Sequence, residues 1–377
     1  MAEGRAVEGL VSDVSMRNPI LLEDLDYIHD KLSPEEKGRL VGATILITGC
    51  AGFLGYSLLH FFVRFSERLG VRRVIGLDNF MLGQPSWVAR LCAEHAGFLD
   101  VSNFDIITGD VANVLGAPEA DYVIHMASIA SPTFYRQFPI ETLDANVWGL
   151  RRLLDFYVDK PIKGFLFFSS SEIYGDPAPE HIPTDEEYRG NVSCIGPRAC
   201  YDEAKRFGET MCYLFAQRYN MPITIARPFN NFGPGMSPQD RRVPADFAHA
   251  VIEGRDIEIF SDGAPTRTFC YVADAIVGYL KVLLHGRFDY FNIGMDRPEV
   301  SIRELANIYV EAAQKVFGYR GALRLAPPPD AEYLTHNPNR RCPNIQKAHR
   351  ILGFDPEITV HSGVERFLRF LHYEARS

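Results

Sequence analysis

The chain has 377 residues, of which 46% are hydrophobic and 23% are charged, as in an ordinary globular protein with a substantial core. Its formal net charge of −9 argues against a nucleic acid or an anionic membrane surface as a partner. No apolar run reaches the length of a transmembrane helix, and no secretory leader is evident. The seven cysteines include no Cys-x-x-Cys pair, so they predict reduced thiols, a cytoplasmic protein and no metal site.

Residues 1–40 precede the first expected strand and form a predicted helical appendage. One amphipathic helix is indicated by apolar residues at helical spacing, namely Leu21, Leu25, Ile28 and Leu32. The sequence Ser33-Pro34-Glu35-Glu36 then resembles a capping box that opens a second, short helix. We expect this part to pack on the core or on a second subunit rather than to have a separate function.

A glycine turn follows the apolar run Thr44-Ile45-Leu46-Ile47 and precedes a segment with helical apolar spacing. Its glycines allow a close approach of the backbone to a pyrophosphate, which the positive end of the helix can hold. The next apolar run ends at Asp78, whose carboxylate is placed to accept hydrogen bonds from a ribose 2′-hydroxyl, a group that NAD has and NADP lacks. The sequence predicts an NAD site that includes Gly49, Gly52, Phe53, Leu54, Gly55, Asp78 and Asn79.

Beyond the turn, short apolar runs alternate with helical patterns, which is typical of a parallel sheet covered on both faces. We expect strands at 44–48, 73–77, 104–107, 121–125, 163–169 and 222–226, and helices near 53–67, 140–158, 200–218, 243–254, 302–317, 343–352 and 361–374. The predicted fold is a Rossmann-type doubly wound α/β sheet with a smaller mixed α/β lid domain. We expect an NAD-binding domain at 41–232, which carries the catalytic residues, and a mainly substrate-binding domain at 233–377, from which a strand near 288–292 returns to the main sheet.

Two groups of residues have the chemistry of a catalytic site. Tyr201 and Lys205 lie one helical turn apart, so the ammonium group can lower the pKa of the phenol and make it an acid or base near neutral pH. Three serines and Glu172 follow the buried run 165–168, and ligands of a doubly wound sheet bind beyond the carboxyl ends of its strands. The alternative is structural: the serines, Ser169 above all, could form a helix N-cap and turn, and the lysine could be solvated.

Longer motifs are spread along the chain: His125-Met126-Ala127-Ser128-Ile129-Ala130-Ser131-Pro132, Ile195-Gly196-Pro197-Arg198-Ala199-Cys200-Tyr201-Asp202-Glu203, Glu209-Thr210-Met211-Cys212-Tyr213, Arg227-Pro228-Phe229-Asn230-Asn231-Phe232-Gly233-Pro234 and Thr266-Arg267-Thr268-Phe269. On these motifs, the chain from Thr44 to about Phe370 resembles the extended short-chain dehydrogenase/reductase family that modifies nucleotide sugars. The nearest branch is that of the UDP-glucuronate decarboxylases. One departure is Ser193-Cys194, where the resemblance leads us to expect Asn-Pro.

The resemblance implies roles for individual residues. Ser170 takes the place of the active-site serine or threonine, Ser171 and Glu172 match the Ser-Glu pair of the decarboxylases, and Tyr201 and Lys205 match the catalytic pair. Four further residues join the NAD site, with the first of them at the adenine: Asp110, Val111, Ala127 and Asn146. The resemblance further implies that the nucleotide sugar contacts Tyr135, Arg198, Asn230, Arg242 and Arg267. Arginine suits this task because its planar fork can make paired hydrogen bonds to phosphate.

The activity implied by this resemblance is oxidation of UDP-glucuronate at C4 and its decarboxylation to UDP-xylose or the 4-keto intermediate, in a homodimer built on the helix of Tyr201 and Lys205. A nucleotide-sugar 4,6-dehydratase is the main alternative, although many dehydratases place an aspartate where this chain has Ser171. A 4-epimerase is a further alternative. A catalytically silent NAD-sensing protein is the alternative from another class, and the intact Ser170, Tyr201 and Lys205 argue against it.

Overall fold

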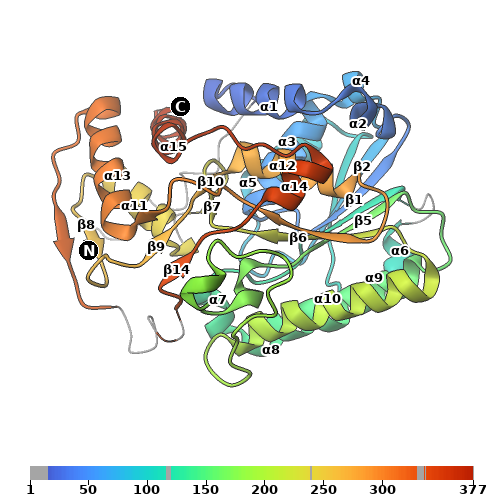
Figure 1. Cartoon of the computed structure of the whole chain (residues 1–377). Coiled ribbons are helices and arrows are strands. Elements are labelled where there is room, and N and C mark those ends of the chain that lie inside the picture. Colours follow the sequence, from blue (N-terminus) through green and yellow to red (C-terminus); the bar gives the residue numbers. More distant parts are fainter. Residues whose placement is uncertain (1–15, 116–119, 238–239, 329–334, 336, 377) are drawn as a thin grey trace, which may run out of the picture.

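The computed structural model describes residues 16–115, 120–237, 240–328, 335 and 337–376. Its centre is a seven-stranded, all-parallel sheet with the order β11-β6-β5-β4-β1-β2-β3 and helices on both faces (Figure 1). The strands are β1 (Thr44–Thr48), β2 (Arg73–Asp78), β3 (Leu99–Asn103), β4 (Tyr122–His125), β5 (Gly164–Phe168), β6 (Ile223–Pro228) and β11 (Asp289–Ile293). The predicted Rossmann-type α/β sheet is therefore confirmed.

Alternation of side chains along the strands explains the two helical layers. In β1, Ile45 and Ile47 belong to one core cluster with α3 (Phe53–Arg64) and α12 (Val272–Leu283), whereas Leu46 belongs to a second cluster with α9 (Leu150–Tyr157) and α10 (Ala199–Tyr219). All five residues of β1 are buried, as expected for a parallel strand covered on both faces. The chain winds away from β1 in both directions, so a switch point lies between β1 and β4.

The remaining helices of the first part of the chain are α1 (Pro19–Lys31), α2 (Pro34–Arg39), α4 (Ser66–Leu69), α5 (Ser86–Glu94), α6 (Val111–Leu115), α7 (Pro132–Gln137) and α8 (Pro139–Asp144). Three short segments are η1 (Ala145–Gly149, a π-helix) and the 3₁₀-helices η2 (Ser171–Tyr174) and η3 (Pro179–His181). The expected helix at 140–158 is thus formed by α8, η1 and α9 in succession. The expected helix at 53–67 ends earlier, at Arg64, and α4 follows it.

One predicted strand is wrong. Residues 104–107 follow β3 instead of forming a strand, and the strand itself is Leu99–Asn103. The prediction followed the apolar side chains of Phe104, Ile106 and Ile107, but β3 is the last strand of the order and is only partly buried. A strand at the edge of a sheet can carry polar residues on its accessible face, so its pattern is weaker than that of the central strands.

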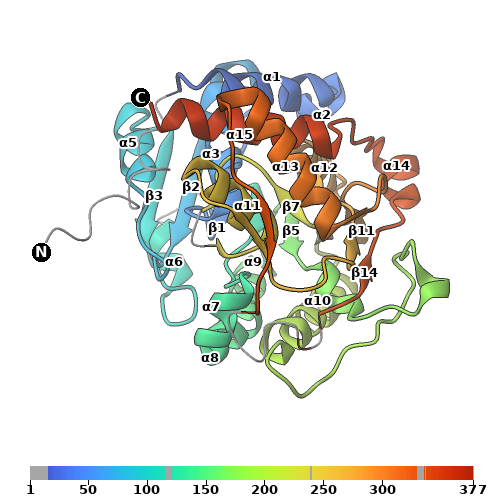
Figure 2. The same ribbon diagram turned by 90° about the vertical axis from the view of Figure 1, so that its left-hand side faces the viewer.

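Past β6, the chain adds β11 to the main sheet and builds smaller sheets. Figure 2 labels β11 and two strands of the smaller sheets, β7 and β14. The paired strands are β7 (Asn231–Phe232) with β10 (Cys270–Tyr271), β8 (Ile257–Ile259) with β13 (Leu323–Leu325), and β9 (Thr266–Arg267) between β12 (Val300–Ser301) and β14 (Arg340–Arg341). The helices here are α11 (Val243–Ile252), α13 (Ile302–Phe317), α14 (Gln346–Leu352) and α15 (Val360–Glu374). The division into two domains near residue 233 stays a prediction.

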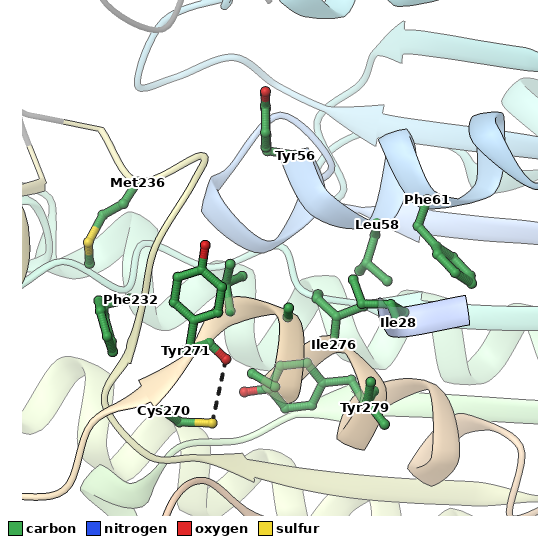
Figure 3. Packing of buried hydrophobic residues seen from close by; sticks show 14 of the residues in the cluster. Ile28, Tyr56, Leu58, Phe61, Phe232, Met236, Cys270, Tyr271, Ile276 and Tyr279 are labelled. Atoms are coloured by element: carbon green, nitrogen blue, oxygen red, sulfur yellow. Dashed lines mark hydrogen bonds between the residues drawn. The ribbon is translucent and has the colours of Figure 1, made fainter. Parts of the chain in front are cut away.

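The N-terminal helices pack on the core. Apolar residues of α1 are buried against α3, α12 and α15, and Figure 3 shows Ile28 beside Leu58 and Ile276. Asp24 accepts a hydrogen bond of 2.6 Å from the Tyr271 hydroxyl and forms an ion pair with Arg366 of α15. The capping box at Ser33 is also present, with Glu36 N donating to Ser33 Oγ at 3.2 Å and Ser33 N donating to Glu36 Oε2 at 2.7 Å. Residues 1–15 of the predicted appendage lie outside the described residues.

None of the helices in the described ranges is long and apolar enough to cross a membrane.

Candidate active site

A cavity of about 1170 Å³ opens beyond the carboxyl ends of the central strands. It exceeds the roughly 300–1,000 Å³ that a single drug-sized ligand occupies, so it has room for a cofactor and a substrate together. Eighteen of the residues predicted for the site line it: Gly49, Gly52, Phe53, Leu54, Gly55, Asp78, Asn79, Ala127, Tyr135, Ser170, Ser171, Glu172, Arg198, Tyr201, Lys205, Asn230, Arg242 and Arg267. Three do not: Asp110, Val111 and Asn146.

The glycine turn has the geometry that a dinucleotide requires. Gly49 has a φ of 70°, and a Cβ added there would lie 2.8 Å from the backbone of Ala127. A Cβ at Gly55 would lie only 2.1 Å from the carbonyl oxygen of Cys50, so α3 can approach β1 this closely only without a side chain. Gly52 precedes α3 and gives it no side-chain cap, which leaves the first N–H groups of this helix available for a phosphate.

Asp78 closes the turn from the end of β2. Its carboxylate accepts hydrogen bonds from Ala51 N at 3.0 Å and from Phe80 N at 2.9 Å, which fixes its orientation beside the glycines. Burial raises the pKa of Asp78, and these two hydrogen bonds oppose the rise. The turn, the free helix end and the fixed acid together fit an adenine dinucleotide.

Two of the predicted site residues that do not line the cavity, Asp110 and Asn146, have identifiable local roles. Asp110 instead caps α6 and accepts a hydrogen bond of 3.1 Å from Ala112 N. Asp110 was expected at the adenine because it follows the strand expected at 104–107. Residues 104–107 instead follow β3 and line the cavity, whereas Asp110 does not. Asn146 is buried within η1 and donates to Ser128 Oγ at 2.9 Å, so it reaches the wall of the cavity through this serine.

Tyr201 and Lys205 lie side by side on α10. The ammonium nitrogen of Lys205 is 5.6 Å from the ring centre of Tyr201 and donates to the carbonyl oxygen of Phe168 at 2.7 Å. Burial lowers the pKa of Lys205 to about 7 and raises the pKa of Tyr201 to about 12, while a hydrogen bond with Ser170 opposes the rise at the phenol. The pKa of the phenol is therefore raised rather than lowered as expected, because desolvation is the largest effect and Lys205 is not among the groups that shift it.

The serines after β5 differ in their contacts. Ser170 is the N-cap of η2, accepts a hydrogen bond of 3.2 Å from Glu172 N and lies within hydrogen-bonding distance of the Tyr201 phenol. Ser169 donates to Glu209 Oε1 at 2.5 Å, and Glu209 forms an ion pair with Arg227. Ser170 therefore serves both as a cap and as a neighbour of the phenol.

Glu172 is held between two arginines, Arg198 and Arg341. Burial alone would raise the pKa of Glu172, but the charges of these two arginines lower it well below its usual range. Arg341 was missed by the sequence analysis. It lies on the two-residue strand β14, and only the parallel pairing of β14 with β9 places it beside Arg267.

Arg267 is a buried cation that binds backbone oxygens, with bonds of 2.7 Å to Thr266 O and 2.5 Å to Pro338 O. No carboxylate forms an ion pair with it within the described part of the chain. Burial and the charge of Arg341 lower the pKa of Arg267 to about 9, so an anionic ligand would stabilise its charged form.

Two other residues predicted to contact the substrate, Arg242 and Asn230, form hydrogen bonds with neighbouring residues. Arg242 forms a bond of 2.6 Å with Asp240, and the amide of Asn230 donates to Thr268 O at 2.9 Å. Within the described ranges, the Tyr135 hydroxyl and the Arg341 Nε are buried without a hydrogen-bond partner. Buried polar atoms in proteins are nearly always paired, so these two atoms favour a ligand at this end of the cavity.

Comparisons with known proteins agree with this geometry. The profile of the family described as "NAD dependent epimerase/dehydratase family" matches residues 45–294. UDP-glucuronic acid decarboxylase 1 of Xenopus tropicalis is 34% identical over 330 residues, which cover 88% of this chain and 72% of that protein. UDP-glucuronic acid decarboxylase 6 of Arabidopsis thaliana is 32% identical over 325 residues, 85% of this chain and 86% of that protein.

Among solved structures, UDP-glucose 4-epimerase of Thermotoga maritima has a TM-score of 0.74 with 24% identity, covering 88% of this chain and 99% of the other. That likeness shows the shared fold. The match of the family profile over most of the chain, together with the glycine turn and the Tyr201–Lys205 pair, leads to one conclusion. This protein belongs to the NAD dependent epimerase/dehydratase family.

Proposed function

We propose that this protein oxidises UDP-glucuronate at C4 and decarboxylates it to UDP-xylose or to the 4-keto intermediate. The observation that carries the proposal is the cluster of Arg198, Arg267 and Arg341 around Glu172, a carboxylate of the cavity wall near Tyr201. Such an excess of positive charge suits a substrate that is anionic at both its diphosphate and its sugar. The similarity to UDP-glucuronic acid decarboxylases over most of the chain supports the same substrate.

Proton transfer at C4 is assigned to Tyr201. As the phenolate, Tyr201 takes the proton of the C4 hydroxyl. Ser170, which hydrogen-bonds Tyr201, stabilises the C4 oxygen as charge develops on it. Bound NAD would supply the acceptor for the C4 hydride and a positively charged ring that favours the phenolate. Lys205, fixed by the Phe168 carbonyl, holds its ammonium group beside the phenol.

Loss of carbon dioxide follows from the C4 ketone, because a carboxylate at C5 is then a β-keto acid. The electrons of the broken C5–carboxylate bond pass to the ketone oxygen, which Tyr201 and Ser170 can hydrogen-bond as an enolate. Ser171 and Glu172 line this part of the cavity and are assigned to orient the sugar and the water molecule from which C5 takes its proton. Arg267, Arg242 and Asn230 are assigned to the diphosphate and nucleotide.

The cofactor is assigned to the glycine turn and to the end of β2. The first N–H groups of α3 would hold the pyrophosphate, and Asp78 would accept the ribose hydroxyls. Ala127 forms the floor of the turn at Gly49, and residues 104–107 form the wall beyond β3.

A 4,6-dehydratase is less well supported by this site, because it needs an acid to protonate the departing hydroxyl. Ser171 is a poor acid, and Glu172 is held in its ionised form by two arginines, so neither has a proton to give readily. A 4-epimerase would leave the carboxylate on the sugar. A silent NAD-sensing protein has no need of Ser170, Tyr201 and Lys205 together in one cavity.

A homodimer is proposed from one exposed apolar face. Large apolar side chains on α8, η1 and α10 are exposed, and these three elements contact one another. Figure 1 shows α8 beside α10. The face comprises Ile140, Leu143, Trp148, Phe207, Tyr213 and Leu214. Six exposed large apolar side chains on three adjoining elements indicate an interaction surface, and a second copy of this chain is the occupant that the family resemblance favours. The seven unpaired cysteines support a reducing compartment, which we propose to be the cytoplasm.

The substrate is tested with UDP-glucuronate, UDP-glucose and dTDP-glucose incubated with the NAD-loaded protein and analysed by mass spectrometry. We expect UDP-glucuronate alone to react, losing the mass of carbon dioxide, because only its C5 substituent becomes a β-keto acid. If UDP-glucose or dTDP-glucose loses water while UDP-glucuronate stays intact, the decarboxylase proposal is refuted and a 4,6-dehydratase activity is supported.

The phenol is tested with Tyr201→Phe, which removes one oxygen and leaves the ring stacked on Tyr135. We expect kcat to fall on the order of hundredfold or more, with substrate still bound, because the C4 proton has lost its acceptor. Tyr219→Phe, at the exposed end of the same helix, is the matched control and should retain full activity. Near-normal turnover by a folded Tyr201→Phe protein would exclude the assigned role.

The cofactor preference is tested by titrating stripped protein with NAD and NADP. A 2′-phosphate would meet the like charge of Asp78, so we expect NAD to bind at least about tenfold more tightly than NADP. Asp78→Asn should narrow this ratio, since it removes the charge. Equal affinities in the wild type would contradict the assignment of Asp78.

The dimer is tested by analytical ultracentrifugation of Trp148→Glu and Phe207→Glu. We expect a dimer for the wild type and a shift toward monomer for both variants, because each charge would be desolvated at the interface. Leu325→Glu alters an exposed leucine on β13, outside the face, and should remain dimeric. A monomeric wild type, or variants that sediment like the wild type, would overturn the assignment.

A further inference from the structure

Asp202 is a buried carboxylic acid that the mechanism above does not use. It follows Tyr201 on α10, is only 6% exposed and is absent from the walls of the cavity. Its Oδ2 lies 3.4 Å from Arg198 Nε, and its Oδ1 is buried without a hydrogen-bond partner in the described part of the chain. A buried carboxylate is costly unless it is paired and hydrogen-bonded, and the only ion pair of Asp202 in the described part of the chain is the one with Arg198.

Arg198, its partner, connects several parts of the site. It is the N-cap residue of α10, and its Nη2 donates to Glu172. Its guanidinium also lies 5.9 Å from the ring centre of Tyr135, and that ring is stacked on Tyr201 with centres 5.3 Å apart and an interplanar angle of 13°. An arginine side chain has many rotamers, and each contact that fixes one of them reduces the entropy lost when substrate binds.

We propose that Asp202 is a positioning residue that holds Arg198 against Glu172 and Tyr135. In this position, the guanidinium group of Arg198 faces the carboxylate of the substrate sugar. This inference rests on the proposed decarboxylase function. Asp202 itself touches neither the cavity nor the assigned substrate position, so it acts through Arg198.

The pair differs from an ordinary i,i+4 pair on a solvated helix face. The side chains of Arg198 and Asp202 are only 12% and 9% exposed, whereas Glu203 and Arg206, a neighbouring pair on the same helix, are 40% and 37% exposed. Exposed pairs of the second kind contribute little, because solvent screens them. The buried pair is screened much less and can constrain Arg198.

The charged groups around Asp202 predict a pH dependence. Those that act on it are Glu172 from η2, Arg341 from β14 and Arg198 at the start of its own helix, and the other titratable neighbours are Tyr135 of α7 and Cys200 and Tyr201 of α10. Burial and repulsion by Glu172 raise the pKa of Asp202. As pH falls, Asp202 therefore takes up a proton at a higher pH than an ordinary aspartate does, and its ion pair with Arg198 is lost.

The ionised form of Asp202 is the one that favours substrate binding. Substrate should bind better as pH rises through the ionisation of Asp202, because Arg198 is then held by a charged partner. The KM of UDP-glucuronate should fall over that range. Tyr201 and Lys205 also titrate, but they act on proton transfer at C4 and so should appear mainly in kcat.

The test compares Asp202→Asn with the wild type and with Glu203→Gln, a control on the exposed side of the same helix. KM and kcat for UDP-glucuronate are measured across pH, after melting temperatures have shown that each protein is folded. We expect Asp202→Asn to raise KM about tenfold at the alkaline end, to abolish its pH dependence and to leave kcat within about threefold. Asp202→Glu should restore the pH dependence, and Asp202→Ser replaces Asp202→Asn if that variant unfolds.

If Asp202→Asn or Asp202→Ser shows the same dependence of KM on pH as the wild type, the positioning role is overturned. The same holds if either variant has a lower melting temperature but unchanged KM and kcat. Calorimetric titration of the NAD-loaded proteins with UDP-glucuronate separates this result from the fate of the proposed function. If the wild type binds UDP-glucuronate without turning it over, decarboxylation is refuted. Weaker binding by Asp202→Asn than by Glu203→Gln would still support positioning, and equal binding would refute it.

Discussion

The parallel direction of all seven central strands is the constraint on which the site depends. It brings the carboxyl ends of the strands to one edge, and the chain leaves that edge through the glycine turn, Asp78, Ala127, Ser170 and Asn230 in turn. These segments lie far apart in sequence, yet they meet in one cavity because each strand ends at the same level. The core on both faces of the sheet therefore supplies the rigidity that the site requires, while the loops supply its chemistry.

Electrostatic balance is the second theme of the site. Burial destabilises the charged groups near Tyr201 by removing them from water. Ion pairs with two arginines offset this desolvation at Glu172, and a hydrogen bond to a backbone carbonyl offsets it at Lys205. Arg267, held by backbone oxygens, keeps its positive charge available for a ligand. The raised pKa of the phenol and the lowered pKa of Lys205 describe the protein without ligands, and both charged forms would be favoured by ligands of the right charge.

The sequence predicted the fold where local pattern and burial agree. The helix expected at 302–317 is α13, because its apolar spacing and capping serine define it without tertiary context. The third strand was misplaced because an edge strand needs few apolar residues, and Asp110, which was expected to follow that strand into the site, caps α6 instead. Arg341 could not have been predicted, since only the pairing of two short strands brings it to Glu172. The pKa of Tyr201 was predicted in the wrong direction, because burial depends on neighbours that sequence spacing does not reveal.

The central claim is that hydride transfer at C4 makes the carboxylate leave. UDP-glucuronate carrying deuterium at C4 tests it most directly, with the NAD-loaded protein in ordinary water and the products analysed by mass spectrometry and NMR. The account predicts release of carbon dioxide with the deuterium returned to C4 of the pentose, or kept on the cofactor where the 4-keto pentose is released. Carbon dioxide released while the deuterium passes into water, or a product that keeps its carboxylate, would contradict it.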